Sequence, residues 1–192
     1  VAQNPCASAQ ILHELSYHHD RTTRQYVTAN PNTPTESLLE LAADFPQTFL
    51  DNPIFSLLYL EQPHFIQTLP TQTAVKLLQC EQAPTSWLQQ VSIEVRQILA
   101  KSRSTPITIL GKLADDRTCW VCQAVAQNPR TPTEYLIWLA GNTNSSVRWA
   151  VAGNPHTPIE YLIRLVDDGD NLVRWAVASN PQTPAALLEQ LV

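Results

Sequence analysis

The chain has 192 residues, 44% of them hydrophobic and only 15% charged, and its formal net charge is −5. This acidic balance disfavours nucleic acid and acidic membranes as partners, because both attract a basic protein face. No run of about 18 consecutive apolar residues occurs, so we expect no membrane-spanning helix.

An Asn-Pro pair recurs along the chain and marks the ends of predicted helices. Proline lacks an N–H group and pushes the preceding residue out of the α region, so a helix must end before each pair. Steps of 26 residues separate positions 4 and 30, 128 and 154, and 154 and 180, whereas a shorter loop reduces the step from 30 to 52. We expect the side chains of these asparagines to bond backbone groups at the turns and to form a structural ladder between copies: Asn4, Asn30, Asn52, Asn128, Asn154 and Asn180.

A Thr-Pro pair follows shortly after and predicts where the next helix begins. Threonine is a good N-cap, proline is favoured at the first helical position, and a glutamate three residues after the threonine completes a capping box. The full pattern occurs three times, at Thr33 to Glu36, Thr131 to Glu134 and Thr157 to Glu160.

Three regular copies of the pattern begin at Val121, Val147 and Val173. Each predicts a short α or 3₁₀ helix before Asn-Pro and a second helix after Thr-Pro, where leucine and isoleucine recur at helical spacing. Isolated helices shorter than about 12–15 residues are marginal in water. Each copy must therefore bury its valines and leucines against its neighbours, which is the logic of a solenoid.

The string V-R-x-x-V-A-x-N-P-x-T-P-x-x-x-L-x-x-L resembles the leucine-rich repeat variant, a bacterial repeat family. The resemblance implies an all-α, right-handed superhelical solenoid of alternating short α and 3₁₀ helices, with about 26 residues per repeat and no strands. We expect N-terminal repeats over residues 1–60, degenerate repeats over 61–92 and regular repeats over 93–192, in one continuous solenoid. The chain contains no Met and begins inside a copy, so we expect it to be part of a longer protein.

The cysteines, Cys6, Cys80, Cys119 and Cys122, do not have the spacing of a secreted disulfide framework, which favours the cytoplasm. Cys119 and Cys122 form a C-x-x-C pair that would place two thiols on one face of a helix. A metal site needs about four ligands, and no second such pair is present. Two cysteines at variable positions are the simpler interpretation. Some members of the family named above carry a cysteine-ligated iron–sulfur module, so a redox or iron–sulfur-associated role is our alternative hypothesis.

Arginine recurs at one position of the copies, and tryptophan follows it twice. Arginine can grip carboxylates or phosphates with two parallel hydrogen bonds, and Trp beside Arg is typical of interaction hot spots. The alternative is that the tryptophans pack internally and that each arginine pairs with an acidic residue of the adjacent copy, such as Asp115, Asp116, Asp167, Asp168 or Asp170. The arginines are Arg24, Arg96, Arg148 and Arg174, and the tryptophans are Trp149 and Trp175.

No glycine-rich phosphate loop or nucleophile elbow occurs, and the cluster of His13, His18 and His19 lacks the H-E-x-x-H spacing of a zinc protease. We therefore predict a non-catalytic, bacterial, cytoplasmic scaffold without metal or cofactor. Its predicted partner is a protein or peptide, and not nucleic acid or a membrane. The predicted binding residues are Arg96, Arg148, Arg174, Trp149 and Trp175.

Overall fold

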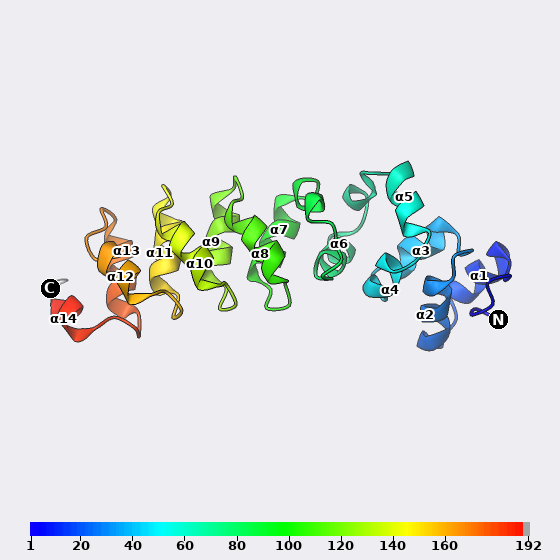
Figure 1. Ribbon diagram of the computed structural model, residues 1–192, viewed down its shortest axis with the longest axis horizontal. Helices are drawn as coiled ribbons and strands as arrows, with labels where there is room; N and C mark the ends of the chain where they lie inside the picture. The colour runs from blue at the N-terminus through cyan, green and yellow to red at the C-terminus, as the bar shows by residue number, and fades with distance from the viewer. Residues whose placement is uncertain (190–192) are drawn as a thin grey trace. The chain divides into compact units, whose positions relative to one another are not determined.

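The computed structural model describes residues 1–189, which contain fourteen α-helices, two 3₁₀ segments and no strand (Figure 1). The prediction of an all-α protein is confirmed. The chain divides into two compact parts, Val1–Val95 and Arg96–Val192, which we name the N-terminal part and the C-terminal part.

The N-terminal part contains six α-helices: α1 (Ala9–Ser16), α2 (Arg21–Ala29), α3 (Thr35–Leu41), α4 (Pro46–Leu50), α5 (Phe55–Glu61) and α6 (Thr71–Leu78). Its two 3₁₀ segments, η1 (Phe65–Gln67) and η2 (Thr85–Gln89), fall in the stretch where the sequence period is lost. Aromatic rings pack there in place of the repeated valines and leucines. The Trp87 ring is fully buried, and its centroid lies 5.3 Å from that of Phe65 and 5.9 Å from that of Phe55.

The boundary between the two parts lies within α7 (Ile93–Lys101), and the C-terminal part continues from there. Helices α9 (Cys119–Gln127), α11 (Ser145–Gly153) and α13 (Asn171–Ser179) pack side by side, and we name them the first row (Figure 1). Helices α8 (Ile107–Ala114), α10 (Thr133–Ala140) and α12 (Ile159–Leu165) pack against them and form the second row. The final helix is α14 (Ala185–Leu188).

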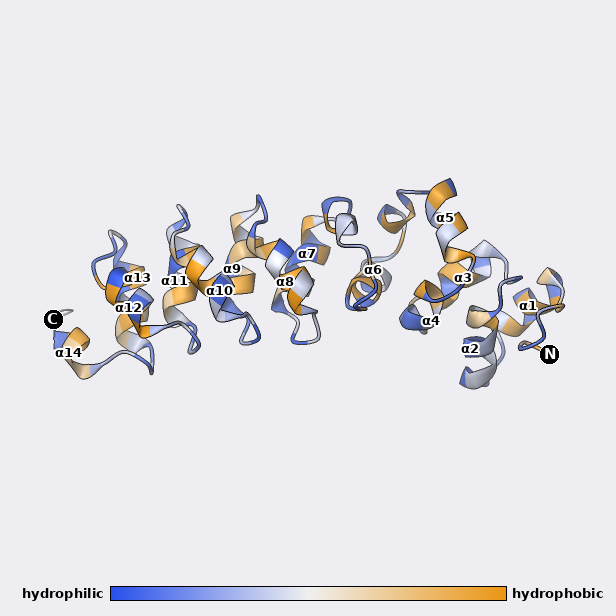
Figure 2. Cartoon of the chain, viewed as in Figure 1, coloured by the Kyte–Doolittle hydropathy of each residue, from blue (hydrophilic) through white to orange (hydrophobic). Residues whose placement is uncertain are grey.

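The two rows follow from the spacing of apolar residues. In α11, Val147 and Val151 are fully buried and lie one turn apart, and the small Ala150 beside them lets neighbouring helices approach closely. In α12, Leu162 and Leu165 are buried where α12 packs against α11 and α13. Figure 2 shows the resulting separation of apolar and polar residues on different sides of the helices. Both helices of a regular copy are α-helices and neither is a 3₁₀ helix: α11 has nine residues and α12 has seven.

The asparagine side chains connect successive copies. Asn154 Nδ2 donates to the carbonyl of Ala126 at 2.6 Å and to that of Asn128 at 3.3 Å, and its Oδ1 accepts the N–H of His156 at 2.9 Å. Carbonyls at the end of a helix have no partner within it, so one side chain satisfies two copies at once. The same three bonds occur at Asn30, Asn52, Asn128 and Asn180.

Asn4 accepts the N–H of Cys6 at 2.9 Å, and its carbonyl accepts a bond from Asn30. It therefore forms the turn and offers an acceptor to the copy that follows.

The predicted capping boxes are wrong, although the helices begin within a residue of the predicted positions. Thr157 Oγ1 donates to the carbonyl of Val151 at 2.5 Å, and Pro158 is the N-cap residue without a side-chain cap. The threonine stands one residue too early, and its buried hydroxyl meets the end of the preceding helix instead. Thr33 and Thr131 form the same bond to Val27 and Val125.

We expect Asn154→Ala to lower the free energy of unfolding by about 2–3 kcal/mol, because it removes three hydrogen bonds and leaves the carbonyl of Ala126 without its donor. Urea unfolding followed by circular dichroism measures the effect. The control is Gln127→Ala, an exposed position at the end of α9 that should change stability little. Equal stability of the two variants would contradict the linking role of Asn154.

The Tyr135 side chain packs so closely against α8 that residue 111 has no room for a Cβ atom, which explains the glycine there. A Cβ atom there would lie 2.3 Å from the hydroxyl oxygen of Tyr135 and 2.5 Å from its Cζ. Alanine normally stabilises a helix by about 1 kcal/mol relative to glycine. We expect Gly111→Ala to destabilise the wild-type protein and to stabilise the Tyr135→Ala variant. Unfolding midpoints of the four proteins give the answer, and stabilisation in both backgrounds would show that Tyr135 does not need the space.

Candidate interaction surface

The recurring arginines are turned toward the protein. Arg148 Nε and Nη2 lie 2.6 and 2.8 Å from the two carboxylate oxygens of Asp168, and Nη1 donates to the carbonyls of Asn142 and Thr143. The side chains of Arg148 and Asp168 are only 20% and 7% exposed. Hydrogen bonding to Arg148 holds the pKa of Asp168 below its usual value and raises that of the arginine.

The same pairing recurs at other copies. Arg96 Nε lies 2.7 Å from a carboxylate oxygen of Asp116, and Arg24 lies 3.6 Å from Asp44. In each pair the aspartate follows its arginine by 20 residues. A partner bound by Arg96 or Arg148 would have to compete with these internal carboxylates, so partner binding by these arginines stays a prediction.

Arg174 differs from them. Its Nη1 donates to the carbonyl of Asp168 at 2.9 Å, and within residues 1–189 no carboxylate forms an ion pair with it. Arg148 and Arg174 are therefore brought together at Asp168, one on its side chain and the other on its backbone.

Cys122 takes the arginine position in α9. Its thiol lies 3.1 Å from the carbonyl of Asp116, the same relative position that Arg174 contacts, and Asn142 stands where the other copies have aspartate. Burial, with Asp116 nearby, raises the pKa of the Cys122 thiol, whereas reactive cysteines have lowered pKa values. Across the described residues, no group of three His, Cys, Asp or Glu is placed to hold a metal ion. The redox or metal hypothesis stays untested.

The tryptophans lie on the outer side of the first row. Trp175 in α13 is 62% exposed, and Trp149 at the equivalent position of α11 is half-buried. Sequence reasoning missed Trp120 in α9, which is 63% exposed and precedes the equivalent position by three residues, on the same side of its helix. Leu172 holds the corresponding place in α13 and is 60% exposed.

These residues belong to a surface that we name the tryptophan face. It comprises the residues at relative positions i, i+3 and i+7 of the first-row helices, and none of them is buried or charged: Trp120, Gln123, Gln127, Ser146, Trp149, Gly153, Leu172, Trp175 and Ser179.

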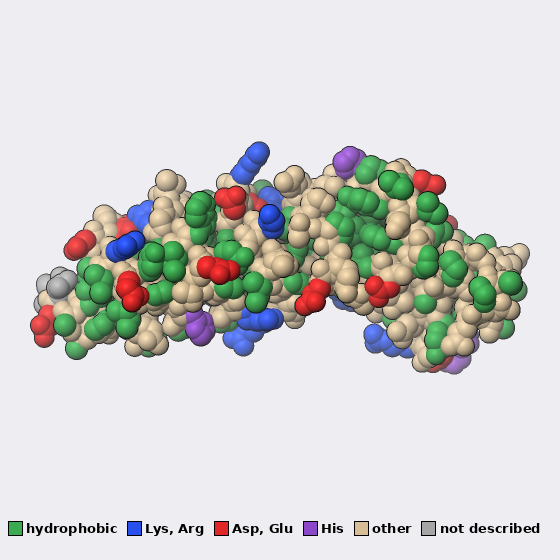
Figure 3. Space-filling model, in the orientation of Figure 1, with side chains coloured by type: hydrophobic (Ala, Val, Ile, Leu, Met, Phe, Trp, Pro, Cys, Tyr) green, Lys and Arg blue, Asp and Glu red, His purple; other side chains and the backbone are tan. Residues whose placement is uncertain are grey.

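The second row has a different surface. Trp138 and Ile163 are exposed there, but Glu134, Lys112 and Arg164 are interspersed with them. In the C-terminal part as seen in Figure 3, acidic and basic side chains are scattered among apolar ones. The uncharged character thus distinguishes the tryptophan face from the second row.

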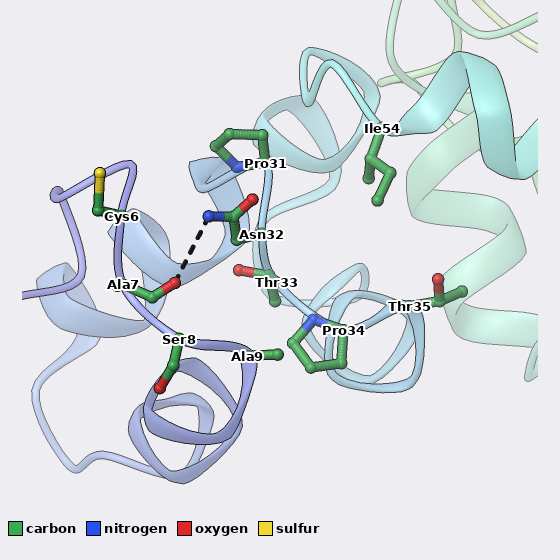
Figure 4. A pocket seen from close by; sticks show the side chains of 10 residues that line it. All are labelled: Cys6, Ala7, Ser8, Ala9, Pro31, Asn32, Thr33, Pro34, Thr35 and Ile54. Atoms are coloured by element: carbon green, nitrogen blue, oxygen red, sulfur yellow. Dashed lines mark hydrogen bonds between the residues drawn. The ribbon is translucent and has the colours of Figure 1, made fainter.

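A cavity of about 580 Å³ lies in the N-terminal part, between the loops that precede α1 and α3 (Figure 4). The side chain of Asn32 joins the two loops, because its Nδ2 lies 3.5 Å from the carbonyl oxygen of Ala7. Cys6 is the only ionisable residue in its lining, so this lining offers no acid–base pair. Between residues 1 and 189, no helix is both long enough and apolar enough to cross a membrane.

Comparisons with protein-family models, characterised proteins and solved structures give no match to the chain. The resemblance to the leucine-rich repeat variant therefore stays a prediction that rests on the sequence pattern.

The pairing of Arg148 with Asp168 predicts a pH dependence. The pKa of Asp168 is lower in the folded protein than in the unfolded chain, where it is about 4. The ionised Asp168 therefore contributes fully to folding stability above the unfolded-state pKa, and this contribution is lost as the pH falls through the folded-state pKa. We expect Asp168→Asn to cost about 1.5–3 kcal/mol at neutral pH and to flatten the loss of stability in acid. Unfolding curves between neutral and acid pH measure both.

Asp167→Asn is the matched control, because Asp167 is exposed and adjacent in sequence. If Asp168→Asn followed the wild-type curve at every pH, the ion pair would contribute nothing to stability.

Proposed function

We propose that this chain is a non-catalytic scaffold whose tryptophan face binds a protein or peptide. The observation that supports this most directly is the exposure of Trp120 in α9 and of Leu172 and Trp175 in α13, the two helices that pack on either side of α11. Contiguous exposed apolar residues mark interaction sites, and tryptophan is the residue most enriched at binding hot spots.

The fold proposed for this scaffold is a right-handed superhelical solenoid like that of the leucine-rich repeat variant. Its support is the recurrence of the asparagine bonds at separations of 26 and 28 residues along the C-terminal part. In this arrangement every copy would add one equivalent position to the tryptophan face. The four free cysteines favour a reducing compartment such as the bacterial cytoplasm.

Within this proposal the arginines act by positioning. Arg148 ties the loop before α11 to Asp168 in the loop before α13, so it holds two first-row helices at a fixed spacing. Trp149 and Trp175 follow the arginine position directly in sequence. Rigid placement of aromatic side chains lowers the conformational entropy lost on binding.

The test is selection of peptides from a random library displayed on phage, with the purified protein as bait. Selected peptides should bind the double variant Trp120→Ala/Trp175→Ala about 30-fold or more weakly, since loss of even one hot-spot tryptophan costs at least about 2 kcal/mol. Trp138→Ala is the matched control, because Trp138 is 66% exposed but lies in the second row. Peptides that bind the double variant as tightly as the wild type would overturn the assignment of this surface.

A further inference from the structure

The spacing of the first-row helices limits what can lie across them. Packed helices are about 8–10 Å apart, so equivalent positions on α9, α11 and α13 recur at about that distance. A polyproline II helix has three residues per turn and rises 3.1 Å per residue, so every third residue returns to the same side after about 9.3 Å. A β-strand returns to the same side after about 6.6 Å, which does not match.

The charge of the tryptophan face limits the partner further. None of its residues is charged, the adjacent Arg148 is paired with the Asp168 carboxylate, and the adjacent Arg174 donates from Nη1 to the carbonyl of Asp168. A basic segment would bury its charges there without a counter-charge, and an acidic segment would find Arg174 alone beside the face, so burial of several charges is costly. The complementary ligand is an uncharged segment.

Hydrogen-bonding capacity points the same way. An indole offers an N–H donor and no acceptor, whereas the amide groups of Gln123 and Gln127 both donate and accept. A proline-rich segment has carbonyl acceptors but few N–H donors, and in the polyproline II conformation its carbonyls form no internal bonds. The indole donors of the face therefore meet a ligand rich in acceptors.

We propose that the tryptophan face binds an uncharged, proline-rich segment in the polyproline II conformation, laid across α9, α11 and α13 with every third residue against one helix. This inference rests on the proposed function and names its ligand. Proline-rich segments bind aromatic surfaces well because their conformation is set before binding and little entropy is lost. The exposed rings of Trp120 and Trp175 would hold the two ends of the segment and Trp149 its centre, with the segment crossing α9 about one helical turn before the position that it meets on α11 and α13.

The experiment uses three uncharged peptides of about twelve residues, with blocked ends and tryptophan-free sequences. The first has proline at every third position, the second has the same composition with its prolines clustered at one end, and the third has glycine and serine in place of proline. Binding is measured by tryptophan fluorescence and by calorimetry with the wild type, Trp120→Ala, Trp175→Ala and Trp138→Ala.

We expect the first peptide to bind at least about 10-fold more tightly than the third and more tightly than the second, and each first-row variant to weaken it about 10-fold. Trp138→Ala should bind like the wild type. Raising the salt concentration from about 50 to 500 mM should change the affinity less than about twofold, because no charge pairs form.

Equal binding of the first and third peptides, or a strong salt dependence, would overturn the polyproline assignment. If the phage selection still gives peptides that need Trp120 and Trp175 but lack the proline spacing, the proposed function stands and only the ligand class is wrong. If no selected peptide needs these tryptophans, both proposals fail.

Discussion

The buried asparagine side chain is the interaction on which the order of the copies depends. An apolar residue at Asn154 could fill the same volume but could not supply both donors and the acceptor that the site uses. Its donors satisfy the end of a helix in the preceding copy, and its acceptor forms the turn of its own copy. Packing of valine and leucine tolerates sliding, whereas this bond geometry does not, so the asparagine fixes the register that the apolar residues stabilise.

The helical class and most helix ends could be predicted, because they depend on local sequence. The Asn-Pro pairs mark where helices end, the Thr-Pro pairs mark where helices begin, and the valine and leucine spacing of Val147 to Leu165 identifies the buried sides. The role of Thr157 could not be predicted, since a hydroxyl can accept from its own helix or donate to the previous one. The cluster around Trp87 has no period, so its packing depends on contacts that sequence spacing does not reveal.

The candidate site was predicted only where it follows the repeat. Trp149 and Trp175 were found because they share one position, whereas Trp120 lies three residues earlier in its copy and was considered only as part of the C-x-x-C segment. Knowing that α9 begins at Cys119 places Trp120 on the outer side of the first row. The inward direction of Arg96 and Arg148 had a signal in the sequence, the aspartate 20 residues after each, but distance along the chain alone does not establish a contact.

Because Cys122 stands at the arginine position of α9, the joints between successive first-row helices are not all held by the same interactions. Arg96 and Arg148 each join a helix of one copy to the loop of the next, but Cys122 and Asn142 leave the joint between α9 and α11 without such a clamp. Segments held by fewer interactions open at lower free energy. Among the joints of α7, α9, α11 and α13, the one between α9 and α11 thus depends on the Asn154 bonds and on apolar packing without an Arg–Asp pair.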